Sequence, residues 1–401
     1  MDVSRSVRYR RTPRGAVLYT TQWFPAEVGG TAPTKDPKGA VLLLSGLNSY
    51  MSNNHDWLAG WLLKQGLAVF GYDHHAFGRS TDLEEFEVPA TGVWDNFSRA
   101  IKRAACCFGR RAYVPNFQGL VHDAAFMVRE VTAAVPSGVP IFLIGESMGG
   151  TIALEAARGL SGLPLHLILF APMCSLGKTV AVHPAVECVG WVLSKVAPLL
   201  PTPLMKDTAS LHAKSPERLR EAKADPLRWQ HAVRLGTAFQ LKQAAAAAQA
   251  RLALYNPSSL LVLHGSADLM CPLAGSLALL TQAPVKDKAL VEYEGGLHAL
   301  WAEPVETRRR LLRDVLAWVG GRAIGAGGGG GLAAHAPAGV DPSEDSGGQL
   351  AAPDLSRMAV LRAEGTFLHA LRPEGKGEFV DSSAFSATRG FVAATGGAQA
   401  M

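Results

Sequence analysis

The chain contains little cysteine. Its 401 residues include five, an odd number, and no two of them have the spacing of a zinc-ligand pair. The five are Cys106, Cys107, Cys174, Cys188 and Cys271. The sequence therefore predicts neither a disulfide framework nor a metal site built on cysteine.

Long apolar runs are also missing. No stretch approaches the roughly 20 apolar residues that a membrane-spanning helix needs, and residues 1–5 have no apolar core of a secretory signal. We therefore expect a cytoplasmic protein, although the early arginines leave organelle targeting open as an alternative. The net charge is +5, but no nucleic-acid-binding motif accompanies it, so nucleic acid is not an expected partner.

The most informative motif present is Gly-Glu-Ser-Met-Gly-Gly at 145–150. The apolar run 139–144 before it predicts a buried strand, and the small residues of 151–158 after it predict a helix. A strand that turns at once into a helix needs glycine two residues before and two after the serine, because side chains there would collide with their neighbours. G-x-S-x-G also occurs by chance in a chain with 42 glycines, but the flanking strand and helix favour a nucleophile elbow with Ser147 as the nucleophile.

A serine nucleophile needs two partners. A histidine must accept the hydroxyl proton, and a carboxylate must stabilise the imidazolium that forms. In chains with such an elbow, the acid and then the histidine follow the serine, each on a loop after a late strand. The strand predicted at 259–263 leads to Asp268, and the strand predicted at 289–293 leads to His298. Either residue alone would be ordinary, but their order and positions predict a triad with Ser147.

The tetrahedral intermediate of acyl transfer also needs two backbone N–H groups to bind its oxyanion. One donor follows the nucleophile in the sequence and is therefore Met148. The other belongs to the loop after an early strand. The apolar run 40–44 ends in Ser45, Gly46 and Leu47, and we take the Leu47 N–H as the second donor.

Strands and helices alternate along most of the chain, which predicts an α/β fold with a mostly parallel sheet covered on both faces. Amphipathic helices are expected at 122–135 and 303–319. The alternation stops between 174 and 234, where apolar and charged stretches broken by prolines predict an inserted helical segment. We divide the chain into one domain, 1–320, and a tail, 321–401. The tail is rich in glycine and alanine and is expected to be disordered, with at most a weak element at 355–371.

Taken together, these residues resemble a known family, the monoacylglycerol lipase-like and lysophospholipase-like α/β-hydrolases, especially their plant and algal members. The resemblance covers about residues 10–319. The matching segments are Gly145–Gly150, Ala171–Cys174, His264–Asp268, Gly296–His298, Tyr72–Ser80 and Tyr113–Phe117. It implies an α/β-hydrolase fold in which 174–234 forms a helical cap. It implies no metal and no cofactor, because Asp73, His74 and His75 fall on the family's strand-to-loop segment.

The chain departs from the family pattern in two places. Ser45 and Gly46 stand where the family usually has His-Gly, and residues 76–78 read Ala-Phe-Gly where it usually has Gly-His-Gly. Neither change removes a catalytic group, but both alter the packing behind the oxyanion loop.

The resemblance implies a serine esterase that cleaves a small lipid ester, of monoacylglycerol or lysophospholipid type, through an acyl-enzyme on Ser147. Two alternatives stay open. One is an esterase for phenolic (caffeoyl) esters, as some plant relatives are. The other is a non-catalytic α/β-hydrolase that binds a ligand or partner, against which the complete triad argues.

The stretch 81–112 is longer than its counterpart in the family. It contains apolar residues at helical spacing, namely Val93, Phe97, Ile101, Ala104 and Phe108. Cations lie among them: Arg99, Lys102, Arg103, Arg110 and Arg111. One interpretation is a solvated excursion or a mis-predicted exon. The other is an interfacial helix that contacts an anionic membrane, with Cys106 and Cys107 as acylation sites.

Overall fold

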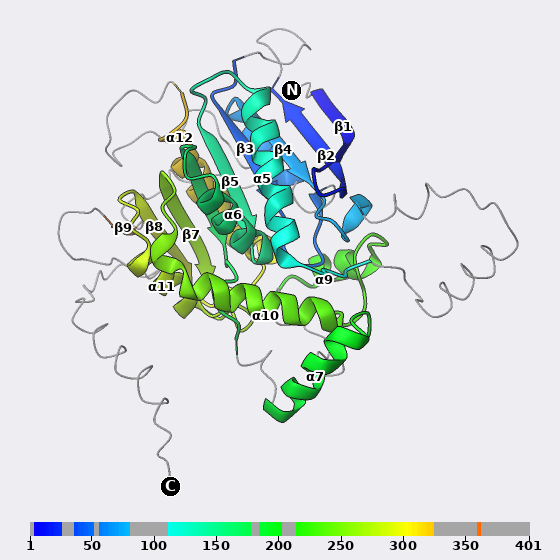
Figure 1. Cartoon of the computed structure of the whole chain (residues 1–401). Helices are drawn as coiled ribbons and strands as arrows, with labels where there is room; N and C mark the ends of the chain where they lie inside the picture. Colours follow the sequence, from blue (N-terminus) through cyan, green and yellow to red (C-terminus); the bar gives the residue numbers. More distant parts are fainter. Residues whose placement is uncertain are drawn as a thin grey trace, which may run out of the picture.

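A nine-stranded sheet covered by helices on both faces forms the centre of the computed structural model (Figure 1). The structure describes residues 4–25, 36–51, 56–80, 111–177, 184–202, 214–324 and 359–361. In chain order the strands are β1 (Ser4–Arg11), β2 (Val17–Phe24), β3 (Gly39–Leu44), β4 (Leu67–Tyr72), β5 (Ile141–Glu146), β6 (Leu165–Phe170), β7 (Ser259–Gly265), β8 (Lys288–Tyr293) and β9 (Ala359–Leu361).

The spatial order of the strands is β1-β2-β4-β3-β5-β6-β7-β8-β9. The six strands from β4 to β8 in this order are parallel, and antiparallel pairs occur at the edges, where β1 pairs with β2, β2 with β4 and β8 with β9. Strands buried on both faces consist of continuous apolar runs such as 40–44. The predicted α/β fold with a mostly parallel sheet is confirmed.

The helices with described positions flank this sheet. They are α2 (Asp56–Lys64), α5 (Phe117–Ala134), α6 (Met148–Gly159), α7 (Pro184–Val196), α9 (Pro216–Ala224), α10 (Leu235–Ala250), α11 (Leu273–Gln282) and α12 (Val305–Gly320). The helices predicted at 122–135 and 303–319 correspond to α5 and α12. The start of α5 lies earlier than predicted because Asn116 caps it, accepting a hydrogen bond from the Gln118 N–H at 2.9 Å. None of these helices combines the length and apolarity that a membrane crossing requires.

The hydrophobic core has two parts, one on each face of the sheet, because successive strand residues point in opposite directions. On β3, Leu42 and Leu44 belong to the cluster on the face covered by α5, α6 and α11. Val41 and Leu43 pack on the other face with α2 and α12. The sheet is thereby held rigidly between two layers, which fixes the ends of its central strands in space.

Among the described residues between β6 and β7, the chain forms helices α7, α9 and α10, and no strand lies between them. Helices α7 and α9 fall inside the stretch 174–234, and α10 follows it and packs on α5, α6 and α7. In Figure 1, α7 projects away from the sheet beyond α10. Residues 178–183 and 203–213 of this stretch lie outside the described residues.

Two other predicted segments lie almost wholly outside the described residues. Of the stretch 81–112, only Arg111 and Ala112 are described, so the interfacial helix, Cys106 and Cys107 stay predictions. Of the tail, the structure describes 321–324 and β9. Strand β9 falls within the weak element predicted at 355–371 and pairs antiparallel with β8.

Residues 76–78, which read Ala-Phe-Gly where the family usually has Gly-His-Gly, place an alanine in a strained conformation. Ala76 has φ +74°, and the Phe77 side chain behind it is buried in the core. A side chain in the left-handed region costs roughly 1–2 kcal/mol, so Ala76→Gly should stabilise the fold by about 0.5–1 kcal/mol after the added entropy of the unfolded chain. Thermal unfolding should show a Tm increase of about 1–2 °C.

The control for this prediction is Ala246→Gly, at an exposed position inside α10. Glycine there should destabilise the helix by about 1 kcal/mol, because the backbone is already in a conformation that alanine favours. Equal destabilisation by both substitutions would show that Ala76 is not strained.

Candidate active site

Ser147 lies at the sharp turn between β5 and α6, with φ 52° and ψ −114°. Such a conformation is costly for a residue with a side chain and persists only where the surroundings enforce it. Here β6 and the loop after it do so: the Ser147 N–H donates to the Phe170 carbonyl at 2.8 Å, and the Ser147 carbonyl accepts from the Met173 N–H at 3.0 Å. The side chain of Ser147 remains partly exposed.

The glycines of the motif make room for this turn. A Cβ atom on Gly145 would lie 2.6 Å from the carbonyl oxygen of Gly149. A Cβ atom on Gly149 would overlap the carbonyl oxygen of Leu44, at the end of β3. The collisions expected from the sequence are therefore present, and both involve backbone atoms that cannot move without distorting the sheet.

The structure brings Ser147, His298 and Asp268 into one hydrogen-bonded chain. The Nε2 atom of His298 lies 2.9 Å from the Ser147 Oγ, and its Nδ1 atom lies 2.6 Å from Oδ2 of Asp268. Asp268 is in the turn after β7, and His298 is in the loop after β8. Because β5, β7 and β8 are parallel, their carboxyl ends share one edge of the sheet. The arrangement allows Nδ1–H to donate to the carboxylate while Nε2 accepts the serine proton.

Asp268 is held as a carboxylate. Its burial would by itself raise the pKa, but hydrogen bonds from His264, from His298 and from the Cys271 N–H hold the pKa well below its usual range. The N–H groups of Met270 and Cys271 both donate to Oδ1, at 2.8 and 2.9 Å. The carboxylate is therefore ionised at neutral pH and fixed in orientation.

The two loops that carry Asp268 and His298 are joined by backbone hydrogen bonds. The Ala267 N–H donates to the Gly296 carbonyl at 3.0 Å, and the Ser266 N–H donates to the Tyr293 carbonyl at the same distance. This ladder extends the β7–β8 pairing past the strand ends. It keeps the acid and the histidine in register although 30 residues separate them.

The oxyanion donors proposed from the sequence follow two neighbouring parallel strands, β3 and β5. Met148 is the first residue of α6, and Leu47 lies in the loop after β3. Within the described part of the chain, neither N–H group donates a hydrogen bond. Both are therefore available to an acceptor outside the protein, as an oxyanion hole requires.

Buried hydrogen bonds anchor the loop that carries Leu47. The Nε2 atom of His74 lies 3.0 Å from the Ser45 carbonyl oxygen, and the Ser45 Oγ donates to the Ser49 carbonyl at 3.2 Å. His74 is fully buried, which lowers its pKa to about 4 and keeps it neutral. Ser45, which stands where the family usually has histidine, thus forms a hydrogen bond within the loop. At the end of the loop, the Met51 N–H donates to the Asp73 carboxylate at 2.8 Å.

Sequence reasoning missed Cys271, whose buried thiol lies near the Ser147 hydroxyl. Burial, with the nearby Asp268 charge, raises the pKa of this thiol well above its usual value, so it stays protonated. A protonated thiol does not compete with Ser147 as the nucleophile. Its place three residues after the predicted acid was the signal in the sequence that could have drawn attention to it.

Sequence reasoning also missed the polar contacts beside the nucleophile. The Trp301 Nε1–H donates to the carboxylate of Glu146, the residue before Ser147. The Tyr50 hydroxyl, from the oxyanion loop, donates to Oδ2 of Asp225 at 2.5 Å and so joins that loop to the helical segment between β6 and β7. Nothing in the spacing of these residues marks them, because their contacts span more than 150 positions of sequence.

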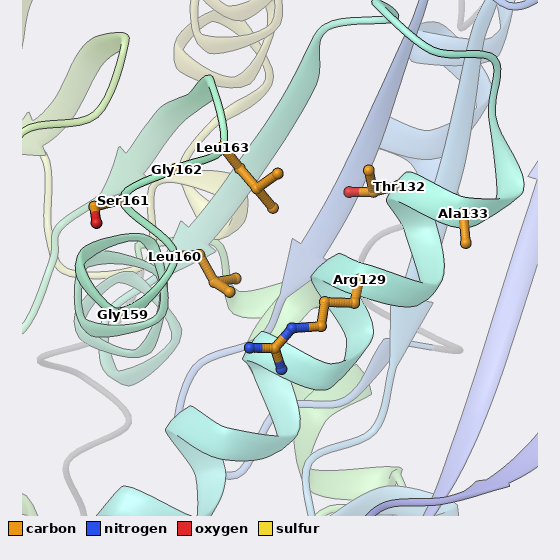
Figure 2. Close-up of a pocket in the computed structure, with 8 residues that line it drawn as sticks. All are labelled: Arg129, Thr132, Ala133, Gly159, Leu160, Ser161, Gly162 and Leu163. Atoms are coloured by element: carbon orange, nitrogen blue, oxygen red, sulfur yellow. The ribbon is translucent and has the colours of Figure 1, made fainter.

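A groove of about 520 Å³ lies elsewhere, between the C-terminal parts of α5 and α6 (Figure 2). It is lined by Arg129, Thr132, Ala133 and residues 159–163. Ser147 precedes the opposite end of α6, which is 12 residues long, or about 18 Å at 1.5 Å per residue. The groove is therefore separate from the triad.

The fold and this geometry define a serine hydrolase of the α/β-hydrolase type, in which a parallel sheet presents a nucleophile elbow. Comparison with known families agrees: the model of the family described as serine aminopeptidase, S33, matches residues 35–305. The chain belongs to this family. It is an enzyme of the carboxylic ester hydrolase class, and the resemblance to monoacylglycerol lipase-like proteins is confirmed.

Individual relatives are similar over most of their length. The monoglyceride lipase of Rattus norvegicus is 28% identical over 323 residues, which cover 78% of this chain and 90% of that protein. The caffeoylshikimate esterase of Arabidopsis thaliana is 25% identical over 349 residues, covering 79% and 86%. Among solved structures, a soluble variant of the Saccharomyces cerevisiae monoglyceride lipase in complex with a substrate analog has a TM-score of 0.59 and 19% identity, covering 78% of this chain and 94% of that one.

Proposed function

We propose that the protein hydrolyses acyl esters of the monoacylglycerol or lysophospholipid type through an acyl-enzyme on Ser147. The observation that carries this proposal is the chain of hydrogen bonds from Ser147 through His298 to Asp268. The Leu47 and Met148 N–H groups, which donate to no acceptor among the described residues, support it. The monoglyceride lipases among the relatives support the substrate class.

The reaction follows from the positions of these groups. His298 Nε2 accepts the Ser147 proton as the Oγ atom attacks the ester carbonyl, and the Leu47 and Met148 N–H groups bind the oxyanion that forms. Asp268 stabilises the imidazolium. His298 then donates its proton to the departing alcohol oxygen, and the C–O bond breaks. Water attacks the acyl-enzyme with His298 again as the base, which releases the fatty acid and restores the Ser147 hydroxyl.

The alternative substrate class is a phenolic ester of the caffeoyl type, which the caffeoylshikimate esterase relative keeps open. The same triad would cleave either ester, so only the alcohol and acyl pockets distinguish them. We favour lipid esters because the segment between β6 and β7 exposes several large apolar side chains on α7. They are Val189, Trp191, Val192, Leu193 and Val196.

The test is a substrate panel with the full chain. Values of kcat/KM are compared for a 2-monoacylglycerol, lysophosphatidylcholine and a caffeoyl ester, with Ser147→Ala as the blank. We expect one of the two lipid esters to exceed the caffeoyl ester by at least about tenfold, a difference of about 1.4 kcal/mol in transition-state binding. A caffeoyl ester preferred by the same margin would reverse the assignment. If a fluorophosphonate probe does not label Ser147, the proposed acyl-enzyme on Ser147 is wrong.

We also propose peripheral contact with a lipid surface. The apolar residues of α7 support it, since Val189 and Val196 are 61% and 74% exposed, and an amphipathic helix binds an interface through such a face. The cations predicted in 81–112 would add attraction to anionic lipid that weakens as salt rises. A cytoplasmic location stays a prediction.

Vesicle flotation tests this contact. The double variant Val189→Gln/Val196→Gln should bind anionic vesicles several-fold more weakly and turn over aggregated monoacylglycerol more slowly, while a short soluble ester is hydrolysed as before. The matched control is Leu254→Gln, because Leu254 is 59% exposed but lies outside α7. Equal flotation of the double variant and the wild type would rule out α7 as the contact.

A further inference from the structure

Asp268 is shared by two histidines. Its Oδ2 atom lies 2.6 Å from Nδ1 of His298 and 3.3 Å from Nε2 of His264. His264 is the last residue but one of β7, four positions before Asp268, and its side chain is completely buried. The mechanism described above gives it no role.

The tautomer of His264 follows from its neighbours. Its Nε2 atom faces two acceptors, the Cys271 carbonyl oxygen at 2.8 Å and the Asp268 carboxylate, so this nitrogen carries the proton. Its Nδ1 atom lies 2.8 Å from the hydroxyl of Ser276, a buried residue of α11, and this hydroxyl is the group able to donate to it. The Nε2–H group therefore donates to the Cys271 carbonyl and also lies 3.3 Å from Oδ2 of Asp268, the oxygen that His298 contacts.

Other groups fix the orientation of the Asp268 carboxylate, so it would not rotate if the His264 N–H were removed. Oδ1 accepts the N–H groups of Met270 and Cys271. The thiols of Cys271 and Cys174 are nearby, but burial raises the pKa of both, that of Cys174 to about 12, so neither carries charge at neutral pH. Oδ2 accordingly has the Nδ1 atom of His298 at 2.6 Å and the Nε2 atom of His264 at 3.3 Å.

We propose that His264 is a positioning residue for ester hydrolysis, which limits how strongly Asp268 binds the proton of the His298 imidazolium. The inference rests on the proposed triad. A carboxylate oxygen with two donors is a weaker acceptor than one with a single donor. With His264 present, His298 releases its proton more easily, so more of it is the free base that Ser147 requires at neutral pH.

The test compares two variants of the full chain by the pH dependence of kcat/KM for a short soluble ester. His264→Leu removes the donor, so the acid limb, which reports the free His298 base, should move up by about half a pH unit or more. His264→Gln keeps an N–H for Asp268 and an oxygen for the Ser276 hydroxyl, so its acid limb should stay within about 0.2 units of the wild type.

A second readout is the NMR resonance of the His298 Nδ1 proton. It should move downfield in His264→Leu, because the hydrogen bond to Asp268 strengthens, and return in His264→Gln. A purely structural role for His264 would lower activity without moving this resonance. If His264→Leu does not fold, Ser276→Ala offers a milder variant: losing the hydroxyl that fixes the tautomer should shift the acid limb in the same direction by a smaller amount.

The outcomes distinguish failure of the proposed function from failure of the proposed role of His264. If Ser147→Ala keeps hydrolysis, the proposed function falls and the role of His264 falls with it. If Ser147→Ala is inactive but the acid limb and the resonance of His264→Leu match the wild type, the triad stands and the role of His264 is overturned. The role is equally overturned if the Gln and Leu variants behave alike.

Discussion

Ser147→Ala abolishes ester hydrolysis and leaves the fold intact: this is the largest effect that we expect from a single substitution. The hydroxyl is partly exposed and adds little packing, while the backbone bonds of this residue to Phe170 and Met173 do not depend on it. Without Oγ no acyl-enzyme forms.

Asp268→Asn should lower turnover by about 10⁴, because an amide favours the wrong tautomer of His298.

Release of product from a short ester measures both variants, and the melting temperature verifies that they fold. The control is Cys271→Ala. The Cys271 thiol lies beside Ser147 but stays protonated, so its removal should preserve most of the activity. Activity that survives in Ser147→Ala and disappears in Cys271→Ala would make the thiol the nucleophile and overturn the assignment.

Gly149→Ala should cause the second large effect. The new methyl group would overlap the carbonyl oxygen of Leu44, so β3 and α6 could not keep their present separation. We expect destabilisation of about 3 kcal/mol or more, which exceeds the usual cost of overpacking because the obstacle is backbone. Activity should fall too, since the displacement moves Ser147 and the loop that carries Leu47 apart.

Gly159→Ala is the matched control, at the other end of the same helix. No atom lies within 4 Å of a Cβ atom there, so alanine should be neutral or stabilise the helix by about 0.5–1 kcal/mol. Denaturant unfolding measures both variants. Equal stability of Gly149→Ala and the wild type would show that the elbow tolerates a side chain and that the steric reason for its glycines is wrong.

Much of the fold was predictable from the sequence because its signals are local. The apolar runs at 40–44 and 259–263 are strands since they are buried on both faces, and the alternation with helices required parallel pairing. The positions of Ser147, Asp268 and His298 followed from the same rule, because residues after parallel strands meet at one edge of the sheet. Their catalytic roles stay predictions until the variants are assayed.

Other features depend on contacts between distant parts of the chain, and no local pattern encodes them. The hydrogen bond between His264 and Ser276 requires α11 to pack against β7. The hydrogen bond from Tyr50 to Asp225 requires the segment between β6 and β7 to approach the loop after β3. The left-handed backbone conformation of Ala76 could not be predicted from its residue type either, because alanine rarely adopts it.

The sequence by itself therefore predicted the class of fold and which residues follow which strand, because periodicity acts over a few neighbouring residues. Its motifs carried the resemblance to the family. The tertiary structure alone decided that two histidines lie near Asp268 and which thiol lies near the nucleophile. Those properties depend on distances of about 3 Å between side chains from different elements, and such distances are set only when the two faces of the sheet pack.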